Sequence, residues 1–167
     1  MSKVLYTAKA HVAGGRAEGR GETSDGSLVV DLRMPPEPGG KDGGTNPEQL
    51  FAIGFAACFE SALGVVARRR QLESADVAID SAVMLIPTDE RGLKLAVQLD
   101  VSVPSVDDPD DAVELVRAAH EVCPYSNATR GDIDVGLTAN AGQSEPYMRR
   151  ARRLGGASRG GPRCPTP

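Results

Sequence analysis

The sequence contains no tryptophan, and aromatic residues make up only 4% of its 167 residues. A hydrophobic core must therefore consist mainly of aliphatic side chains, and a hydrophobic content of 40% is sufficient for one globular domain. The opening MSKVLYTAKA has no apolar signal core, and no later run is expected to be long enough to span a membrane. These absences predict a cytoplasmic protein with no membrane partner.

Cysteine and histidine are also scarce. Three cysteines are too few for a disulfide scaffold, so any disulfide is expected to be transient and catalytic rather than structural. There are only two histidines, His11 and His120. His120 and Cys123 are three residues apart and form a possible ligand pair, but a zinc site needs three or four ligands. We therefore expect no metal and no cofactor.

Acidic and basic residues are unevenly distributed along the chain. The formal net charge is −4, but residues 141–167 contain six arginines and a single acid, so the preceding residues carry −9. An acidic body argues against nucleic acid as the main partner. Residues 141–167 show no apolar period, which predicts a disordered Arg/Gly/Pro-rich tail with Cys164 as an exposed thiol without a role. The folded domain is expected to span residues 1–140.

Local patterns predict an α+β fold with mostly antiparallel sheets. The Asp25–Gly26 pair indicates a hairpin turn at the end of a turn-rich loop. The helix that follows Asn46, a good N-cap, has apolar residues on every face and is expected to be buried centrally. Gly54 and Gly64 within it indicate either close packing against another backbone or ordinary tolerated glycines. Strands are expected at 3–12, 27–32, 76–87, 92–104 and 132–139, and helices at 47–70 and 108–122.

The stretch EVCPYSNATRGDIDV, residues 121–135, places a cysteine in a turn that ends a helix. A phosphate-binding loop needs five residues between cysteine and arginine, whereas six separate Cys123 from Arg130. Pro124 also removes the first amide donor that such a loop would use. These two departures disfavour a phosphatase and leave Cys123 as either a core thiol or half of a redox pair.

Cys58 lies in FAACFESAL, in the middle of the apolar helix. Taken alone, this position favours a buried core thiol, because free cysteine is among the most buried residue types. Two features favour reactivity instead. Glu60 and Ser61 follow two and three residues after Cys58, so a polar region meets the helix there. Cys123 is available to capture an oxidised Cys58 as a disulfide.

Three segments resemble the organic hydroperoxide resistance (Ohr) proteins of the OsmC/Ohr superfamily. They are LYTAKAHVAGGRAEGRGETSDGSLVVDL at 5–32, GGTNPEQLFAIGFAACFESAL at 43–63 and HEVCPYSNATRGDIDVGL at 120–137. The resemblance covers residues 1 to about 140. It implies an OsmC/Ohr-like α+β fold, with antiparallel β-sheets around a long central helix, and an intertwined homodimer with sites at the interface.

The resemblance also implies a thiol peroxidase that reduces fatty-acid and other organic hydroperoxides to alcohols. The reductant would be a dihydrolipoyl group on a carrier protein, or another dithiol. Carried over by motif, Cys58 is the peroxidatic cysteine, Cys123 the resolving cysteine, and Arg16 and Glu48 their catalytic partners. Arg16 is preferred to Arg20 because it directly follows the paired glycines.

The residue types suit these implied roles. Arg16 is always cationic, so it can lower the pKa of Cys58 and hold a peroxide oxygen, while Glu48 can orient Arg16 through a bidentate pair. Apolar neighbours would favour an alkyl peroxide over hydrogen peroxide, because only the former gains from burial. Three residues are candidates for this contact, although simple core packing explains them equally well: Phe55, Phe59 and Leu63.

The spacing of Glu48 and Cys58 constrains how a site could form. Ten residues separate them, which is about 15 Å along a continuous helix. Either the helix breaks near Gly54, or the site combines groups from two chains. We hypothesise that the Arg16–Glu48 pair of one chain serves Cys58 of the other.

Two other functions remain open at this stage. One is a more general OsmC-type peroxidase with a different preferred peroxide. The other belongs to a different class, a non-enzymatic thiol redox sensor or hydrophobe-binding protein that would turn over poorly with any dithiol. No DNA-binding helix is evident in the sequence, which weighs against a transcriptional sensor.

Overall fold

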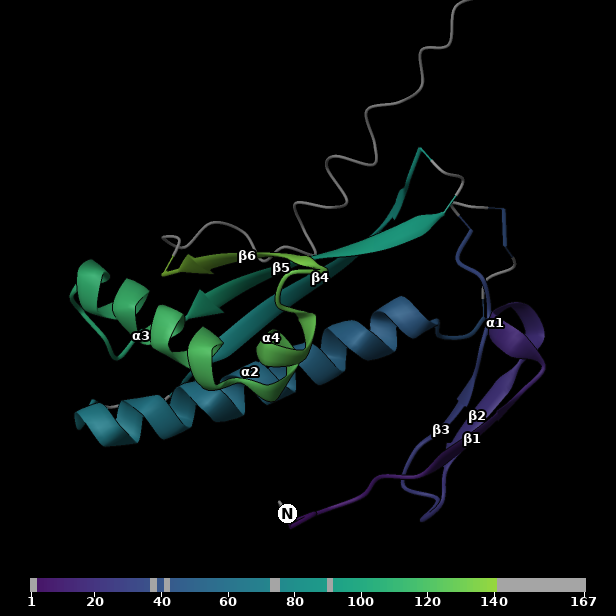
Figure 1. Ribbon diagram of the computed structural model, residues 1–167, viewed down its shortest axis with the longest axis horizontal. Helices are drawn as coiled ribbons and strands as arrows, with labels where there is room; N and C mark the ends of the chain where they lie inside the picture. Colours follow the sequence, from purple (N-terminus) through teal and green to yellow (C-terminus); the bar gives the residue numbers. More distant parts are fainter. Residues whose placement is uncertain (1–2, 37–38, 41–42, 73–75, 90–91, 141–167) are drawn as a thin grey trace, which may run out of the picture. The chain divides into compact units, whose positions relative to one another are not determined.

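The computed structural model describes residues 3–36, 39–40, 43–72, 76–89 and 92–140 of the chain. The chain divides into two compact units, Met1–Phe51 and Ala52–Pro167, and the boundary falls inside a long helix. In the described residues each unit holds one three-stranded sheet, so the fold is α+β as predicted (Figure 1). The predicted tail at 141–167, with Cys164, lies outside the described residues.

The first unit is built on an antiparallel sheet with the strand order β1-β2-β3. Its elements are β1 (Ala10–Ala13), α1 (Gly15–Glu18), β2 (Arg20–Thr23) and β3 (Val29–Asp31). The strand expected at 3–12 is therefore shorter than predicted, and the expected loop contains a helical turn and a strand. A four-residue helix is too short to show a periodic pattern, which is why the sequence did not reveal α1.

The Asp25–Gly26 pair forms the predicted hairpin turn between β2 and β3. Gly26 has a φ of 70°, in the left-handed region that favours glycine. The Asp25 carboxylate accepts hydrogen bonds from the Thr23 hydroxyl at 2.6 Å and from the Ser27 N–H and hydroxyl at 3.1 and 2.8 Å. These hydrogen bonds, chiefly the one from Thr23, lower the pKa of Asp25 to about 2.

The long helix α2 (Pro47–Arg70) begins where its capping residue predicts. The Asn46 side chain accepts a hydrogen bond from the Gln49 N–H at 2.9 Å. The opposite sides of α2 differ in burial, since Ile53 is 70% exposed while six other side chains are buried. The expectation of burial on every face was therefore right for one side only. The buried residues are Phe55, Phe59, Ala62, Leu63, Val66 and Ala67.

By length and composition, α2 is also able to cross a bilayer. An 18-residue window of this helix has a mean hydropathy of 2.0, because Glu60 is the only charged residue between positions 49 and 67. The expectation that no run is long enough to span a membrane was therefore wrong on these two criteria. The central helix of a soluble protein meets the same criteria, so one such helix is weak evidence for a span.

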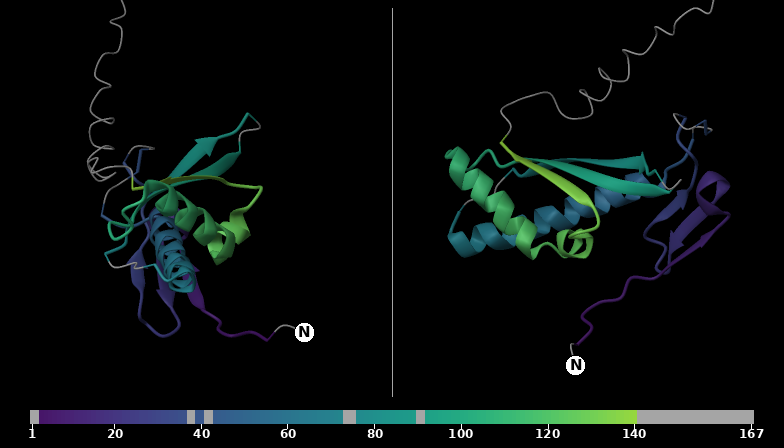
Figure 2. Two further views of the ribbon diagram at one scale, coloured as in Figure 1. Left: turned by 90° about the vertical axis from the view of Figure 1, so that its left-hand side faces the viewer. Right: turned by 45° about the horizontal axis from the view of Figure 1, so that its top comes forward.

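The second unit has a sheet with the order β4-β5-β6, and α2 and α3 lie on the same face of it (Figures 1 and 2). Strands β4 (Ala78–Pro87) and β5 (Leu93–Ser102) match two of the predicted strands and form an antiparallel hairpin, whereas β6 (Asp134–Ala139) is parallel to β5. The other strand pairs of the described residues are antiparallel, so the prediction of mostly antiparallel sheets is confirmed. Two helices connect β5 to β6, so the chain returns to the starting end of β5 before β6 begins.

These two helices are α3 (Pro109–Val122) and α4 (Pro124–Thr129). Helix α3 matches the helix predicted at 108–122. Its N-cap is Asp108, whose carboxylate accepts hydrogen bonds from the N–H groups of Asp110 and Asp111 at 2.8 and 3.3 Å. Helix α4 was not predicted, because six residues are again too few for a periodic signal.

Candidate active site

The first unit holds the predicted ion pair between Arg16 and Glu48. Gly14 and Gly15, with φ of 78° and 68°, turn the chain from β1 into α1 and so place Arg16 on that helix. Arg16 Nη2 donates to both Glu48 carboxylate oxygens, at 2.8 and 2.7 Å. The Arg16 side chain is 39% exposed and that of Glu48 is 18% exposed. The pair ties α1 to the first turn of α2.

Arg20 has a different partner. Its guanidinium lies 3.3 Å from the Asp31 carboxylate on the neighbouring strand, and both side chains are more than half exposed. The preference for Arg16 over Arg20 as the partner of Glu48 therefore agrees with the structure. An exposed cross-strand pair of this kind contributes little to stability.

The second unit brings the two predicted redox cysteines together. Cys58 is half-buried on α2, and Cys123 is fully buried between α3 and α4. Their sulfur atoms are 3.7 Å apart and both thiols are free. A disulfide needs about 2.05 Å between the sulfurs. A small movement of either side chain would therefore allow the bond to form.

The backbone around Cys123 is fixed on both sides. Its N–H donates to the Ala119 carbonyl at 2.9 Å, which closes the last turn of α3, and its carbonyl accepts from the Asn127 N–H at 3.0 Å. Pro124 occupies the first position of α4, where its missing N–H costs nothing. The same proline that disfavours a phosphate loop thus starts a helix immediately after the cysteine.

The pKa of Cys58 is raised above its usual value. Burial is the main cause, and the neighbouring Cys123 adds to the rise. The Tyr125 backbone N–H hydrogen-bonds to Cys58 and opposes the rise, because it stabilises the thiolate. Arg16 belongs to the other unit, so its expected lowering of this pKa stays a prediction.

The comparisons with known proteins agree with one another. Residues 39–138 match the family model described as OsmC-like protein. The organic hydroperoxide resistance protein of Xanthomonas axonopodis pv. citri (strain 306) is 51% identical over 140 residues, covering 81% of this chain and 95% of that protein. This chain belongs to the organic hydroperoxide resistance proteins of the OsmC-like family. The relationship supports a part in peroxide resistance of the Ohr/OsmC type.

Other relatives of this Ohr-type protein give the same result. The organic hydroperoxide resistance protein OhrB of Bacillus subtilis (strain 168) is 47% identical over 134 residues, covering 80% of this chain and 96% of that protein. A solved organic hydroperoxide resistance protein from Legionella pneumophila superposes with a TM-score of 0.77 at 52% identity, covering 81% of this chain and 97% of that one. The Ohr/OsmC fold expected from the sequence motifs is thus confirmed.

Sequence reasoning missed Tyr125 in this Ohr-type chain. The side chain of Tyr125 lies over Gly54 of α2, where an added Cβ would come within 3.3 Å of the phenol oxygen. Its ring also packs edge-on against Phe55, with ring centroids 5.7 Å apart. Together with the hydrogen bond from its N–H to Cys58, these contacts join α4 to the part of α2 that carries Cys58. The feature of the sequence that could have identified Tyr125 is its position two residues after Cys123 in the motif.

The predicted substrate contacts are not supported for three apolar residues of α2. Each has an exposed fraction of 0% and belongs to the buried core. A side chain without exposed surface can contact a bound alkyl chain only after rearrangement of that core. Simple core packing, the other explanation for these residues, agrees with the structure. They are Phe55, Phe59 and Leu63.

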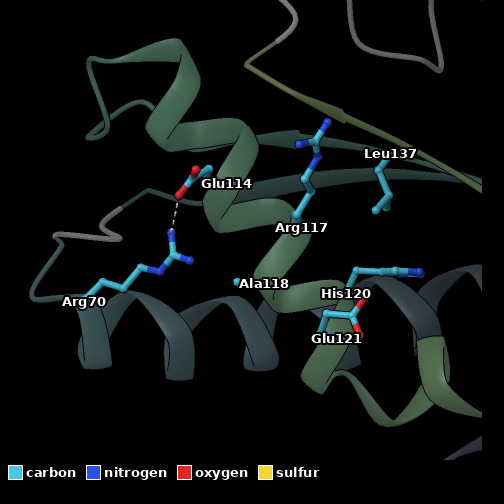
Figure 3. Close-up of a pocket in the computed structure, with 7 residues that line it drawn as sticks. All are labelled: Arg70, Glu114, Arg117, Ala118, His120, Glu121 and Leu137. Carbon is cyan, nitrogen blue, oxygen red and sulfur yellow. Dashed lines mark hydrogen bonds and ion pairs between the residues drawn. The ribbon is translucent and has the colours of Figure 1, made fainter.

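A surface pocket of about 410 Å³ lies elsewhere in the second unit (Figure 3). Arg70, at the end of α2, forms an ion pair with Glu114 of α3 at 3.5 Å across one side of it. Burial lowers the pKa of His120, which also lines it, and the Arg130 charge adds to the effect. The remaining lining residues are Arg117, Ala118, Glu121 and Leu137, so neither cysteine contributes.

Proposed function

We propose that this protein is a thiol peroxidase that reduces organic hydroperoxides, of fatty-acid or alkyl type, to alcohols. One observation carries the proposal: two free thiols from segments 65 residues apart lie with their sulfurs at 3.7 Å. A peroxidase that forms a disulfide requires two such thiols side by side. The substrate class is taken from relatives named for organic hydroperoxide resistance.

The reaction has three steps. The Cys58 thiolate attacks the terminal oxygen of the hydroperoxide, the O–O bond breaks, and the released alkoxide takes up a proton to leave as the alcohol. Cys58 is then a sulfenic acid, and the Cys123 sulfur attacks its sulfur. The S–S bond forms, the S–O bond breaks, and water leaves. An external dithiol, such as a dihydrolipoyl group on a carrier protein, reduces the disulfide by exchange. The scheme uses no metal and no cofactor.

Arg16 and Glu48 have supporting roles in this scheme. The guanidinium stabilises the Cys58 thiolate and binds the peroxide oxygens, and Glu48 keeps it oriented through the two hydrogen bonds seen in the first unit. The apolar part of the substrate gains from leaving water, which favours an alkyl hydroperoxide over hydrogen peroxide. Thiols that rest in the reduced state suit a cytoplasmic setting.

We further propose that the active protein is a homodimer whose sites combine both chains. Helix α2 runs without a break through Gly54, so Glu48 and Cys58 stay about 15 Å apart along one helix. Apolar side chains are also left uncovered in the single chain, which a second copy would bury: Val4 at 74%, Leu5 at 93% and Ile53 at 70% exposure.

The test counts thiols and mass after one equivalent of cumene hydroperoxide is added. A Cys164→Ser background removes the third thiol, so that only the two relevant cysteines are counted. In this background we expect the peroxide to remove both thiols rapidly and dihydrolipoamide to restore them. When Cys58→Ser is added to the background, peroxide should change neither the mass nor the thiol count of the variant. Survival of both thiols in the parent protein would falsify the peroxidase proposal and make Cys58 a core residue.

The same assay separates the two alternatives. A general OsmC-type peroxidase would consume hydrogen peroxide with a kcat/KM similar to that for cumene hydroperoxide. A redox sensor would form the disulfide once but turn over poorly with dihydrolipoamide or any other dithiol. Steady turnover that strongly prefers organic hydroperoxides supports the proposed function over both.

A further inference from the structure

Arg130 follows α4 directly, and its guanidinium bonds to both helices that flank Cys123. Nη1 donates to the Glu121 carboxylate of α3 at 2.9 Å. Nη2 donates to the Asn127 side-chain oxygen of α4 at 3.2 Å and lies 3.5 Å from the carbonyl oxygen of His120, near the end of α3. Figure 3 labels Glu121 and His120 on this last turn of α3. One side chain therefore holds the end of α3 and the body of α4 at a fixed angle.

This angle determines where the Cys123 sulfur lies. That sulfur is 3.7 Å from the sulfur of Cys58. Closing the sulfur separation to about 2.05 Å requires an approach in line with the bond that breaks. A displacement of about 1 Å can change the rate of such a step by roughly a hundredfold.

We propose that Arg130 is a positioning residue for the resolving step: it holds the α3–α4 turn so that the Cys123 sulfur meets the sulfenic acid of Cys58. The inference rests on the proposed peroxidase function. In this step the S–S bond forms and the S–O bond breaks. The proton of the Cys123 thiol leaves with the hydroxyl group as water, and the hydroperoxide has already supplied the oxidising equivalents.

The placement of Arg130 separates this role from a purely structural one. The side chains of Arg130 and Glu121 are 47% and 64% exposed, so their ion pair contributes little to the stability of the fold. The first reaction, between Cys58 and peroxide, does not require Cys123 to approach. Loss of Arg130 should therefore slow disulfide formation while leaving both the folded protein and the first reaction intact.

The experiment measures how much of the oxidised Cys58 becomes disulfide and how much becomes sulfinic acid. With increasing cumene hydroperoxide, a sulfenic acid that is resolved slowly is oxidised again to sulfinic acid, and peptide mass spectrometry gives the ratio of sulfinic acid to disulfide. In Arg130→Ala, the peroxide concentration at which half of Cys58 is sulfinic acid should be roughly tenfold lower than in the wild type. The rate at which dimedone-trapped sulfenic acid first forms, and the melting temperature, should match those of the wild type.

Three further variants make the result specific. Arg130→Lys keeps the charge but not the forked donors, and should lie between wild type and Arg130→Ala. Glu121→Gln removes one charged acceptor and should shift the ratio in the same direction. Arg117→Ala is the matched control, because this exposed arginine of α3 has no hydrogen bond or ion pair in the described part of the chain. It should behave as wild type.

The outcomes separate the two proposals. A wild-type protein that forms neither sulfenic acid nor disulfide overturns the peroxidase function, and the Arg130 inference with it. A wild type that turns over, with an unchanged ratio in Arg130→Ala, overturns the inference alone. If the ratio of sulfinic acid to disulfide changes only together with the rate of sulfenic acid formation and the melting temperature, Arg130 has a structural role. That outcome also overturns the inference.

Discussion

The surroundings of Cys58 favour its protonated thiol, whereas the proposed chemistry needs its thiolate. The nucleophile in peroxide reduction is the thiolate. Burial and the neighbouring Cys123 raise the pKa of Cys58, and the Tyr125 N–H offsets only part of that rise. A raised pKa means that the thiol keeps its proton to higher pH, so these groups alone leave little thiolate at neutral pH. A nearby cation is needed, and Arg16 is the candidate.

We therefore expect Arg16→Ala to raise the pH midpoint of Cys58 alkylation. A cation beside an acidic group typically lowers its pKa by about 1 to 3 units, so its removal should raise the midpoint by roughly that amount. The measurement is the rate of iodoacetamide alkylation at Cys58 as a function of pH, read by peptide mass spectrometry. Arg20→Ala is the control, because Arg20 pairs with Asp31 instead. A midpoint that stays in place in Arg16→Ala would remove Arg16 from the proposed mechanism.

At the scale of elements, the two glycines of α2 have different surroundings. A Cβ added at Gly64 would meet only the end of the Arg68 side chain, at 3.4 Å, whereas one added at Gly54 would come within 3.3 Å of the Tyr125 phenol oxygen and 3.4 Å of its ring. Both neighbours are side chains, so the suggested close packing against another backbone was wrong. Gly54 leaves room for Tyr125, and Gly64 is a tolerated helix glycine.

This difference predicts opposite effects of two substitutions. Gly64→Ala should raise the free energy of unfolding by up to about 1 kcal/mol, the difference in helix propensity. Gly54→Leu should lower it, because the larger side chain has to displace Tyr125 from α2. Urea unfolding of the reduced protein measures both changes. A stabilised Gly54→Leu variant would show that Tyr125 moves aside without cost.

The start of α3 allows a second prediction at this scale. The Asp108 carboxylate accepts two hydrogen bonds from the first turn, and an N-cap of this kind contributes about 1 kcal/mol. Asp108→Ala should lower the free energy of unfolding by about that amount, whereas Asp107→Ala, which removes the preceding exposed acid, should leave it nearly unchanged. Equal effects of the two substitutions in urea unfolding would mean that charge, not capping, matters there.

The sequence predicted the elements that carry a repeating pattern. Helix α2 and the β4–β5 hairpin appear where periodicity and capping residues indicate, and the cysteines are paired as the motifs imply. Helices α1 and α4 are only four and six residues long, so they leave no periodic signal. The contacts of Tyr125 and Arg130 depend on the angle between α3 and α4. No local pattern encodes that angle, so these two residues could be identified only in the structure.

For the whole molecule, α2 raises the question of what covers its exposed side. Ile53 is 70% exposed on a largely apolar helix, and the single chain buries only the opposite side of that helix. Apolar residues on every face of a helix indicate burial on every face. The proposed second copy of the chain would account for this pattern, and it would let the Arg16–Glu48 pair serve a cysteine that lies ten residues along the same helix.

A mixing experiment tests this arrangement directly. Arg16→Ala and Cys58→Ser should each be inactive alone, but a heterodimer of the two contains one site with Arg16 from one chain and Cys58 from the other. Co-expression with random pairing should then restore about a quarter of the wild-type activity per chain, since half of the dimers are mixed and each has one complete site. Mixing Arg16→Ala with Glu48→Ala is the matched control and should restore nothing, because both changes affect the same pair. If co-expression of Arg16→Ala and Cys58→Ser also restores nothing while native mass shows heterodimers, each site is formed within a single chain.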